Sequence, residues 1–380
     1  MILTRPYPDE LVGSFLHRTA RQLGLGQEKL LFRLTGRNLS THSLLMTVYP
    51  GIADAAGMPF EELLLEHTVL PYVTAFMKPT ERAVLVSELL SVGSTPRPTS
   101  SLVASSVVGE YGLRVCPRCM RWELENFGET YWHRTHQVSG VRICAVHMCT
   151  LLETELPITR SLAFPPPNEV RYLYRCPTFG LAPEIHESIA ALTAFALSSR
   201  GGLGEQASRY MSRTRELGYV YLGGKAHSTL LSQDLLTFYG AYFLERYDCV
   251  ISEKKKGRWP SRLLSASAGQ STTFKHILLQ SFLESNPSPS ASRIEFEGRN
   301  QPKRRDWSAF QAEAIRALSA EVRRHEIAGT RVNLEALYDL AGIRSAVKTK
   351  KERIPALMQW IENFKASPQS NRIPRRRPRR

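Results

Sequence analysis

The sequence predicts a mainly α-helical, multidomain protein that contains one small cysteine-rich module. Apolar residues recur at helical spacing through most of the chain, which is typical of amphipathic helices. Two polar stretches, residues 92–106 and 284–305, interrupt this pattern and indicate loops or linkers between domains. Three of the six cysteines lie between residues 116 and 144. With 380 residues, the chain is long enough for two or three domains that each bury a core.

The composition is that of a globular protein, with 42% hydrophobic, 9% aromatic and 22% charged residues. No apolar run approaches the roughly 18–20 residues that span a bilayer, so we expect no membrane partner. The opening residues MILTRPYPDE lack the apolar segment of a secretory signal. We therefore expect a cytoplasmic protein in a reducing compartment, where closely spaced cysteines are metal ligands rather than disulfides.

Residues 1–110 are expected to form a helical N-terminal region. The stretch PDELVGSFLHRTARQLGLG predicts a helix with Asp9 as its N-cap and Gly24 just after its end. One apolar stripe of that helix comprises Val12, Leu16, Ala20 and Leu23. A second apolar stretch follows in QEKLLFRLTG, and the pattern returns in AAGMPFEELLLEHTVLPYV, where Pro59 lies near a helix start. These stripes are typical of core packing rather than of a ligand-binding surface.

Residues 111–156 are expected to form a zinc ribbon. Cys116 and Cys119 form one pair, and Cys144 and His147 form a second pair after 24 intervening residues. Each pair directs two side chains at one centre, and three thiolates with one imidazole suit tetrahedral Zn²⁺. Four protein ligands leave no position for water, so we expect the zinc to be structural. A small apolar core beside the metal is expected from Trp122, Phe127, Tyr131 and Trp132.

Other candidate ligands remain as alternatives in this region. Cys149 follows His147 by two residues and could compete as a ligand, although the paired spacing favours His147. His133 and His136 lie three residues apart and could share a metal-binding face, although packing or hydrogen bonding is the simpler interpretation. Two cysteines without a nearby partner are expected to be buried as small apolar residues: Cys176 and Cys249.

The rest of the chain divides by composition. Residues 157–285 are expected to form a helical middle region that opens with a proline-rich loop. Residues 286–305 have the composition of a linker, and residues 306–370 are expected to be helical again. The first helix there is capped by Asp306, and a basic tail of residues 371–380 follows the region. That helix carries several apolar residues near one face: Trp307, Phe310, Ala314 and Leu318.

The stretch VNLEALYDLAGIRSAVKTKKERIPALMQWI has the pattern of a helix-turn-helix. We expect a first helix from Leu334 to Leu340, a turn through Gly342, and a second helix from near Ser345 that Pro355 breaks or kinks. The expected DNA contacts are Arg344, Lys348, Lys350, Lys351 and Arg353. A three-helix structural bundle with a solvated basic face is the alternative.

The net charge is concentrated at the C-terminal end. Residues 301–380 hold 19 Lys and Arg against 8 Asp and Glu, so +11 of the total +15 lies there. This asymmetry predicts association with double-stranded DNA, and hence with the nucleoid, and a solvated basic tail is the alternative. A helical pair near residues 224–242 could also read DNA or simply pack. The tail arginines can neutralise phosphates without reading sequence: Arg372, Arg375, Arg376, Arg377, Arg379 and Arg380.

The motifs of several enzyme classes are missing from the sequence. It contains no GxxxxGK[ST] nucleotide loop, no HExxH zinc-protease motif and no GxSxG nucleophile motif. The acidic residues also show no obvious DDE or DED spacing. We therefore expect a protein that is not an enzyme.

Several stretches resemble the TniQ/TnsD family, whose members select target sites for bacterial transposons. CPRC, then YWHRTHQVSGVRICAVH and a leucine pair, resemble the zinc-ribbon signature of the family. RPYPDELVGSFLHRTARQLGLG resembles the family opening, and LEHTVLPY resembles the element upstream of the ribbon. The chain departs from the family at Met148, where glycine is common. The stretches that resemble the longer TnsD proteins are RELGYVYLGGKAHSTLLSQDLLTFYGAYFLERYDC, WPSRLL, KHILLQSFL, RRDWSAFQAEAIRAL and GTRVNLEALYDLAGI.

The resemblance implies a non-enzymatic adaptor. Such proteins recognise target DNA, directly or through an RNA-guided CRISPR effector complex, and recruit an AAA+ ATPase that engages the transposase. The expected function is therefore that of a DNA transposition target-site selector that binds its target directly. The alternatives are a bridge to a CRISPR effector complex with only non-specific DNA affinity, and a stand-alone transcription factor. The oligomeric state stays open, with a homodimer among the alternatives.

Overall fold

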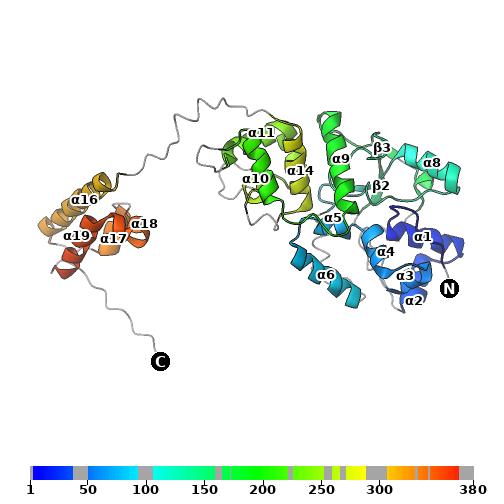
Figure 1. Ribbon diagram of the computed structural model, residues 1–380, viewed down its shortest axis with the longest axis horizontal. Coiled ribbons are helices and arrows are strands. Elements are labelled where there is room, and N and C mark those ends of the chain that lie inside the picture. Colours follow the sequence, from blue (N-terminus) through cyan, green and yellow to red (C-terminus); the bar gives the residue numbers. More distant parts are fainter. Residues whose placement is uncertain are drawn as a thin grey trace. The chain divides into compact units, whose positions relative to one another are not determined.

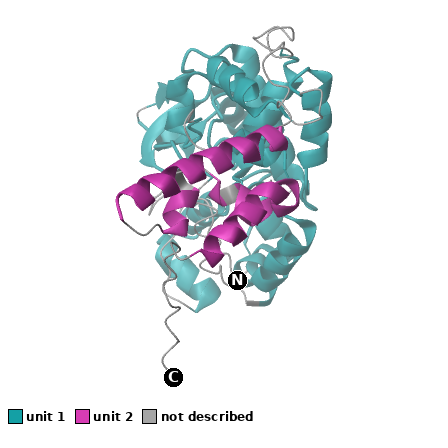
Figure 2. Ribbon diagram, turned by 90° about the vertical axis from the view of Figure 1, so that its left-hand side faces the viewer, with its two compact units in different colours: residues 1–290 teal, residues 291–380 magenta. Residues whose placement is uncertain are grey.

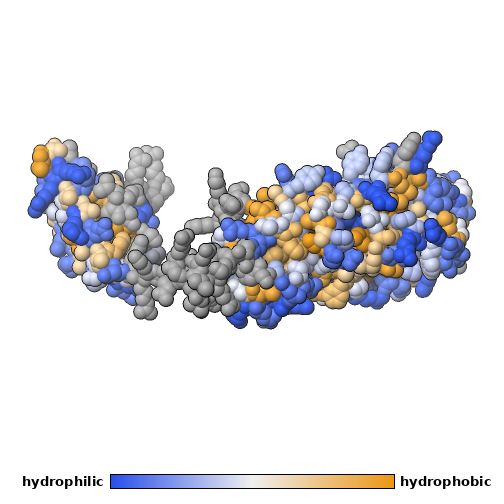
Figure 3. Space-filling model, turned by 90° about the horizontal axis from the view of Figure 1, so that it is seen from above, coloured by the Kyte–Doolittle hydropathy of each residue, from blue (hydrophilic) through white to orange (hydrophobic). Residues whose placement is uncertain are grey.

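The chain folds into two compact units, residues 1–290 and 291–380 (Figure 2). The computed structural model is mainly helical with one small sheet, which confirms the predicted mainly α-helical, multidomain class (Figure 1). Hydrophobic residues lie among hydrophilic ones on the face of the molecule that Figure 3 shows. The structure describes residues 3–36, 50–92, 106–158, 165–171, 173–220, 226–251, 259–265, 271–287, 306–329, 333–340 and 343–367.

The N-terminal region of unit 1 is built from short helices. They are α1 (Val12–Gln22), α2 (Gln27–Thr35), α3 (Pro50–Ala56), α4 (Phe60–Glu66), α5 (Leu70–Thr74) and α6 (Pro79–Val92). Pro59 is the N-cap of α4, as expected, and Gly24 adopts a φ of 63° just beyond α1, as a helix-ending glycine does. The prediction for Asp9 is wrong, because α1 begins after Leu11 without a side-chain cap. The Asp9 carboxylate instead accepts hydrogen bonds from Arg134 and Thr135.

A three-stranded antiparallel sheet brackets the cysteine-rich module. Its strands are β1 (Gly112–Val115), β2 (Leu152–Pro157) and β3 (Leu173–Arg175), in the order β1-β2-β3. Val115 lies opposite Leu152, so the chain leaves the sheet at one end and returns at the same end. Helix α8 (Pro117–Phe127) starts directly after β1. The sheet therefore holds the two ends of the cysteine module next to each other.

The middle region packs around one central helix, α14. The elements of this region are η1 (Pro167–Glu169), α9 (Pro183–Ser198), α10 (Ala207–Glu216), α11 (Ser228–Tyr239), α12 (Ala241–Arg246), α13 (Trp259–Leu263) and α14 (Thr273–Glu284). Helix α14 packs against α9, α10, α11 and α13, and also against α5 of the N-terminal region. Thr273 donates to the Tyr72 carbonyl oxygen at 2.6 Å, and the rings of His276 and Phe76 stack with centroids 4.1 Å apart. These buried contacts join the middle region to the N-terminal region.

A cluster of buried charged side chains joins the cysteine-rich module to the middle region. The Glu110 carboxylate pairs with Arg114 and, at 3.0 Å, with Arg142, and all three side chains are at most 1% exposed. Arg142 also donates to the Tyr247 hydroxyl, and its guanidinium lies 5.4 Å from the centre of the Phe179 ring. Burial of such charges is tolerated because opposite charges and hydrogen-bond partners surround them. No motif in the sequence pointed to this cluster.

Unit 2 is a helical domain with its own core. Its elements are α16 (Trp307–Ile327), α17 (Leu334–Leu340), α18 (Arg344–Thr349), η3 (Lys351–Arg353) and α19 (Pro355–Ala366). Asp306 caps α16 by accepting from the backbone of Ser308 and Ala309, as expected. The predicted apolar face of α16 packs on this core, with Ala314 and Leu318 fully buried. The buried residues from the other elements are Leu337, Tyr338, Ile343, Ala346, Val347, Ile354, Leu357, Ile361 and Phe364.

The helix boundaries of unit 2 differ from the expected helix-turn-helix at one point. The first helix has the expected bounds, and the second begins at Arg344, one residue before Ser345. The second helix ends after six residues at Thr349, and Pro355 does not kink it. Pro355 instead occupies the first turn of the separate helix α19, where its missing N–H costs no hydrogen bond. Gly342 lies outside the described residues.

Among the residues that the structure describes, no helix is long and apolar enough to cross a membrane.

Candidate metal centre

The first pair of donors lies at the junction of β1 and α8. Cys116 is the N-cap of α8, and its sulfur accepts a hydrogen bond from the backbone N–H of Cys119 at 3.4 Å. Pro117 follows at the first helical position, where its fixed φ favours the start of a helix. One helical turn thus presents both sulfur atoms on the same side. A helix N-terminus also favours the thiolate form of a cysteine.

The second pair of donors lies in a tight turn closed by backbone hydrogen bonds. The Met148 N–H donates to the Cys144 carbonyl at 2.8 Å, and the Cys144 N–H donates to the Cys149 carbonyl at 2.9 Å. Met148 has a φ of 49°, in the left-handed region that favours glycine. This conformation reverses the chain directly after His147 and keeps the imidazole on the same side as Cys144.

The four predicted ligands converge in the structure. Cys116, Cys119, Cys144 and His147 each place one donor atom within 4.8 Å of the others, and the three cysteines are buried. The Nδ1 atom of His147 lies 3.6, 3.2 and 3.7 Å from the sulfur atoms of Cys116, Cys119 and Cys144. The sulfur atoms of Cys119 and Cys144 are 3.8 Å apart. With Zn–S near 2.3 Å and Zn–N near 2.0 Å, a tetrahedral site has edges of about 3.8 Å (S–S) and about 3.5 Å (S–N). The donor set therefore fits a tetrahedral zinc ion.

Electrostatics also favours a cation at this point. The neighbouring thiols of Cys116 and Cys144, together with burial, raise the pKa of the Cys119 thiol far above its usual range. Three buried thiolates would repel one another strongly in the absence of a positive charge. A bound divalent cation reverses this effect, because it stabilises the thiolate form of each cysteine that coordinates it. The cluster is thus a poor set of free thiols and a good set of metal ligands.

A cluster of acidic and basic side chains lies next to the centre. Glu123 lies one helical turn after Cys119 and is only 1% exposed. Its carboxylate accepts from the His133 Nε2 atom at 2.6 Å and from the Tyr131 N–H at 3.2 Å. The other ring nitrogen of His133 faces Asp9 at 3.4 Å. His133 therefore binds two carboxylates. One of its ring nitrogens also lies within 4.8 Å of donor atoms of Glu123 and Cys119, so these three side chains could share a metal ion. Glu123 follows Cys119 by four residues, and on a helix this spacing places both side chains on the same face, so the sequence did contain a signal for their proximity.

The charges of this cluster should make stability depend on pH. Burial opposes protonation of His133, but hydrogen bonds to Asp9 and Glu123 outweigh it and raise the pKa of His133 to about 9. This stabilising contribution is complete below the unfolded pKa of about 6.5 and disappears as pH rises through 9. Burial opposes ionisation of Asp9, but His133 and Arg134 outweigh it and lower the pKa of Asp9 to about 2. The Asp9 contribution exists above about pH 4 and is lost as pH falls through 2.

We therefore expect His133→Gln to destabilise the protein more at pH 6 than at pH 9.5. Urea unfolding of the zinc-loaded chain at both pH values measures the difference in the free energy of unfolding. His325→Gln is the control, because this histidine of unit 2 is 36% exposed and faces Glu321 only at 3.7 Å, so it should show a much smaller pH dependence. An equal loss for His133→Gln at both pH values would contradict the proposed charge pairing.

The remaining cysteines and histidine have distinct environments. Cys149 is half-buried, and its sulfur lies 3.3 Å from that of Cys116. Cys176 and Cys249 are buried, as expected, and the Cys249 thiol donates to the Tyr247 carbonyl at 3.3 Å. His136 is also buried, with its ring 4.8 Å from that of His133, which favours the packing interpretation.

The predicted aromatic core beside the metal is correct for only two of its four members. Tyr131 and Trp132 are at most 3% exposed, and the Trp132 indole donates to the Pro165 carbonyl at 2.9 Å. Trp122 and Phe127 lie on α8 with exposed fractions of 49% and 37%, so this part of the prediction is wrong. Helix α8 turns only Cys119 and Glu123 fully inward, since it covers the edge of the module rather than its centre.

Met148 offers a direct test of the turn that carries His147. A left-handed conformation costs a non-glycine residue roughly 1–2 kcal/mol, and the Met148 side chain is half exposed. Met148→Gly should therefore keep the metal and raise the free energy of unfolding by about 1 kcal/mol. Chemical denaturation of both zinc-loaded proteins measures this change. Met120→Gly, within α8, is the control and should lower stability. A Met148→Gly protein that is less stable than the parent would contradict the left-handed turn.

The predicted DNA-binding residues have different surroundings. Lys348, Lys350, Lys351 and Arg353 are exposed at the end of α18 and along η3, and none makes an ion pair with another described residue. Arg344 pairs with Glu335 at 2.6 Å, so it ties α18 to α17. Three predicted contacts, Arg375, Arg376 and Arg377, lie outside the described residues. In the region 224–242, helix α11 exposes the uncharged residues Thr229, Gln233 and Thr237, which favours packing over DNA reading.

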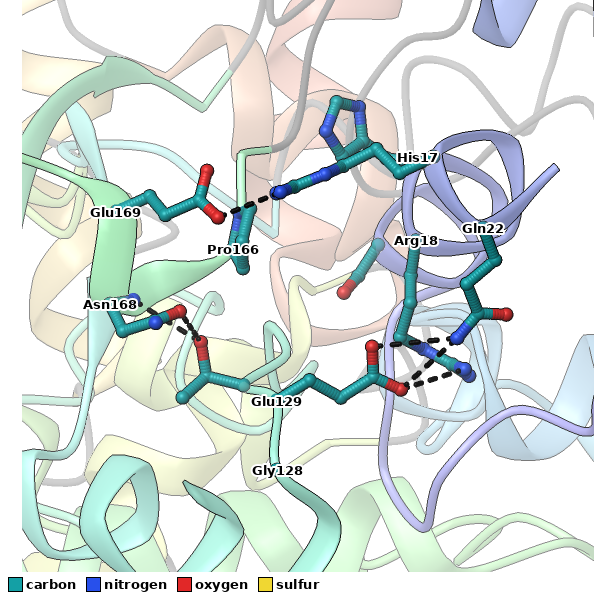
Figure 4. Close-up of a pocket in the computed structure, with 11 residues that line it drawn as sticks. His17, Arg18, Gln22, Gly128, Glu129, Pro166, Asn168 and Glu169 are labelled. Carbon is teal, nitrogen blue, oxygen red and sulfur yellow. Dashed lines mark hydrogen bonds and ion pairs between the residues drawn. The ribbon is translucent and has the colours of Figure 1, made fainter. Parts of the chain in front are cut away.

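A polar pocket of about 350 Å³ lies between α1, the end of α8 and η1 (Figure 4). Its charged side chains are already paired across it. Arg18 and Gln22 donate to Glu129 at 3.3 Å, and Arg21 pairs with Glu169 at 2.8 Å. Such balanced charges do not favour a small anion or cation. Its lining residues are Ser14, His17, Arg18, Arg21, Gln22, Gly128, Glu129, Thr130, Pro166, Asn168 and Glu169.

Fold and donor geometry together define a mainly helical protein with a cysteine–histidine cluster that could hold a metal ion. Residues 1–151 match the TniQ family model, and residues 187–295 match the model described as Tn7-like transposition protein D. The chain is also 25% identical over 150 residues to transposon Tn7 transposition protein TnsD of Escherichia coli. That match covers 37% of this chain and 29% of the relative. The chain belongs to the TniQ/TnsD family of transposition proteins.

Proposed function

We propose that this chain selects target sites for transposition by binding double-stranded DNA and recruiting an AAA+ ATPase that regulates the transposase. The observation that carries this proposal is the succession of a TniQ match and a Tn7-like transposition protein D match along unit 1. The similar protein from Escherichia coli is itself named as a transposition protein. The two matched regions also share buried contacts between α5 and α14, which supports one rigid adaptor. The working place of such an adaptor is the cytoplasm.

We propose that the metal centre is a structural zinc ribbon and not a catalytic site. Cys116, Cys119, Cys144 and His147 would hold the ion, and a zinc ion with four protein ligands has no position left for a substrate or water. The ion would connect the start of α8, which carries Cys116 and Cys119, to the turn that carries Cys144 and His147. We propose the following segments beside this ribbon: residues 1–110 form the N-terminal helical part, and residues 157–285 form the helical middle part. The domain 306–370 follows a linker, 286–305.

We propose that unit 2 provides DNA contacts through the end of α18 and through η3. Lys348, Lys350 and Lys351 follow one another on an exposed surface and suit phosphate contacts. Helices α17 and α18 would be the helix-turn-helix-like pair that carries this surface, and Arg353 would extend it. The basic tail, with Arg375, Arg376 and Arg377, would add contacts that do not depend on sequence.

Replacement of Lys348, Lys350 and Lys351 together by alanine should weaken DNA binding uniformly across sequences. Each lost phosphate contact reduces the slope of log K against log[salt] by about 0.9, so we expect a reduction of about 2–3. Titration of a labelled duplex with the full chain at several salt concentrations gives both slopes. Lys365→Ala, at a lysine paired with Glu362, is the matched control in the same unit. An unchanged slope in the triple variant would contradict the proposed surface.

The mode of targeting is tested with two duplexes. One is enriched from a random library by binding to the full chain, and the other is its scrambled version. A large preference for the enriched duplex at moderate salt supports direct reading of the target. Equal binding to both contradicts direct reading, and it is the result expected of a bridge to an RNA-guided complex. Co-purification with the AAA+ ATPase encoded beside the transposase tests recruitment, and its failure would contradict that part of the proposal.

A further inference from the structure

A further thiol lies beside the four proposed ligands of the metal centre. The four proposed ligands complete the coordination of zinc, yet a fourth cysteine, Cys149, places its sulfur 3.3 Å from the sulfur of Cys116. Two sulfur atoms bound to one tetrahedral zinc ion lie about 3.8 Å apart. The Cys116–Cys149 spacing is thus within about 0.5 Å of a ligand–ligand edge. Among the described residues, the donors that all lie within 4.8 Å of one another do not include Cys149, Cys176 or Cys249, but Cys149 adjoins this group through Cys116.

The backbone, and not only a side-chain rotamer, keeps Cys149 at this position. Its carbonyl accepts the N–H of Cys144 at 2.9 Å, and Ile143 and Thr150 form a β-bridge around that bond. The left-handed conformation of Met148 reverses the chain between His147, which belongs to the donor group, and Cys149, whose sulfur lies beside that of Cys116. The conformation is unfavourable for methionine, and the hydrogen bonds that close the turn hold it in place.

The five donors fall into two groups by burial. Cys116, Cys119 and Cys144 are buried, whereas His147 and Cys149 are both half-buried and come from the same turn. Three buried sulfur atoms therefore form one face of the site, and two partly exposed donors lie at its solvent edge. Ligand exchange is easiest at the solvent edge, because water can occupy the position that a departing ligand leaves. A soft thiolate is also at least as good a zinc ligand as an imidazole.

We propose that Cys149 is a reserve ligand of the metal centre. While His147 holds the ion through Nδ1, the Cys149 thiol lies beside Cys116 and donates a weak hydrogen bond to its thiolate. When His147 leaves, Cys149 loses its proton to water and its sulfur takes the fourth position, so that three sulfurs and one nitrogen become four sulfurs. This inference rests on the proposed zinc site. The exchange lets the ribbon keep its metal when the imidazole is displaced.

Cobalt substitution of the full chain tests the exchange, because the intensity of sulfur-to-cobalt charge-transfer absorption follows the number of thiolate ligands. We expect His147→Ala to retain one Co²⁺ per chain and to absorb about a third more strongly, as three thiolates become four. The double variant His147→Ala/Cys149→Ser should lose the metal. Cys149→Ser alone should keep one Co²⁺ with the spectrum of the parent, and Cys176→Ser is the control.

Two outcomes would overturn the proposal. If His147→Ala loses the metal as completely as the double variant, Cys149 does not replace the histidine. If Cys149→Ser alone loses the metal or a thiolate band, Cys149 is a permanent ligand and not a reserve. A parent chain that binds neither Co²⁺ nor Zn²⁺ would instead contradict the metal centre itself, so the two failures are distinguishable.

A second measurement does not depend on the folding of the His147 variant. A chelator in excess removes zinc from the parent chain and from Cys149→Ser, and the rate of removal is followed by the colour of the chelator complex. We expect faster removal from Cys149→Ser, because no thiol recaptures the ion after His147 dissociates. Equal rates for the two proteins would overturn the proposal.

Discussion

Cys119→Ser should abolish zinc binding and unfold the segment between β1 and β2. Cys119 contributes a buried sulfur that lies within 3.8 Å of both Cys144 and His147, and a serine hydroxyl is a poor substitute for a thiolate. Binding of structural zinc supplies on the order of 10 kcal/mol, which is as large as the stability of a typical domain. Zinc content per chain and limited proteolysis between residues 106 and 158 measure both effects.

The matched control for this prediction is Cys176→Ser. Cys176 is equally buried and lies on the neighbouring chain segment, but it is outside the donor cluster. We expect this variant to keep one zinc per chain and to resist protease within the ribbon. If Cys119→Ser also kept one zinc per chain with unchanged protease resistance, the four-ligand centre would be refuted.

Glu110→Gln should lower the free energy of unfolding of unit 1 by about 3–5 kcal/mol. The change removes the negative charge between Arg114 and Arg142, whose side chains are at most 1% exposed. The remaining carboxylate near Arg142 is that of Glu153, at 3.8 Å, which compensates only in part. Two buried guanidinium groups would then face each other without a full counter-charge. Urea denaturation of the zinc-loaded chain measures the loss.

Glu216→Gln is the control for this second prediction. It breaks an ion pair with Arg213 whose side chains are 35% and 57% exposed, and such surface pairs contribute at most about 1 kcal/mol. Zinc content should remain unchanged in Glu110→Gln, since Glu110 is not a metal ligand. A Glu110→Gln protein as stable as the Glu216→Gln control would show that the buried cluster is not required for the packing of the ribbon against the middle region.

The convergence of the four candidate ligands could be predicted from the sequence because the spacing within each pair is local. Each ligand pair lies within one turn of chain, so Cys116 and Cys119, or Cys144 and His147, converge whatever the rest of the fold does. The antiparallel sheet then brings the two turns together, since Val115 and Leu152 lie opposite each other. Helices with one apolar face, such as α16 and α17, were predictable for the same local reason.

Contacts between distant segments could not be predicted in this way. Asp9 is a residue type that often caps helices. Its carboxylate instead accepts hydrogen bonds from Arg134 and Thr135, which lie 125 residues or more away in the sequence. Trp122 and Phe127 are residue types that are typical of a core, but α8 lies at the edge of the module and leaves them partly exposed. The Glu110 cluster joins residues that lie far apart in the sequence, and no local pattern marks it.

The helix-turn-helix prediction illustrates a limit of a different kind. The bounds of the first helix follow from its apolar spacing, whereas the second helix was expected to run on to Pro355. In the structure it ends at Thr349, and the basic residues Lys350, Lys351 and Arg353 fall in the turn that precedes α19. A proline is compatible with a kinked helix and with the first turn of a new one, so the sequence does not distinguish the two.

X-ray absorption at the zinc edge of the purified full chain tests the central claim most directly. The proposed centre predicts one zinc per chain, coordinated by three sulfur atoms near 2.3 Å and one nitrogen atom near 2.0 Å. No oxygen from water should appear in that coordination shell. A chain without zinc, or a zinc ion with an oxygen ligand in an open position, would contradict a closed structural centre built from Cys116, Cys119, Cys144 and His147.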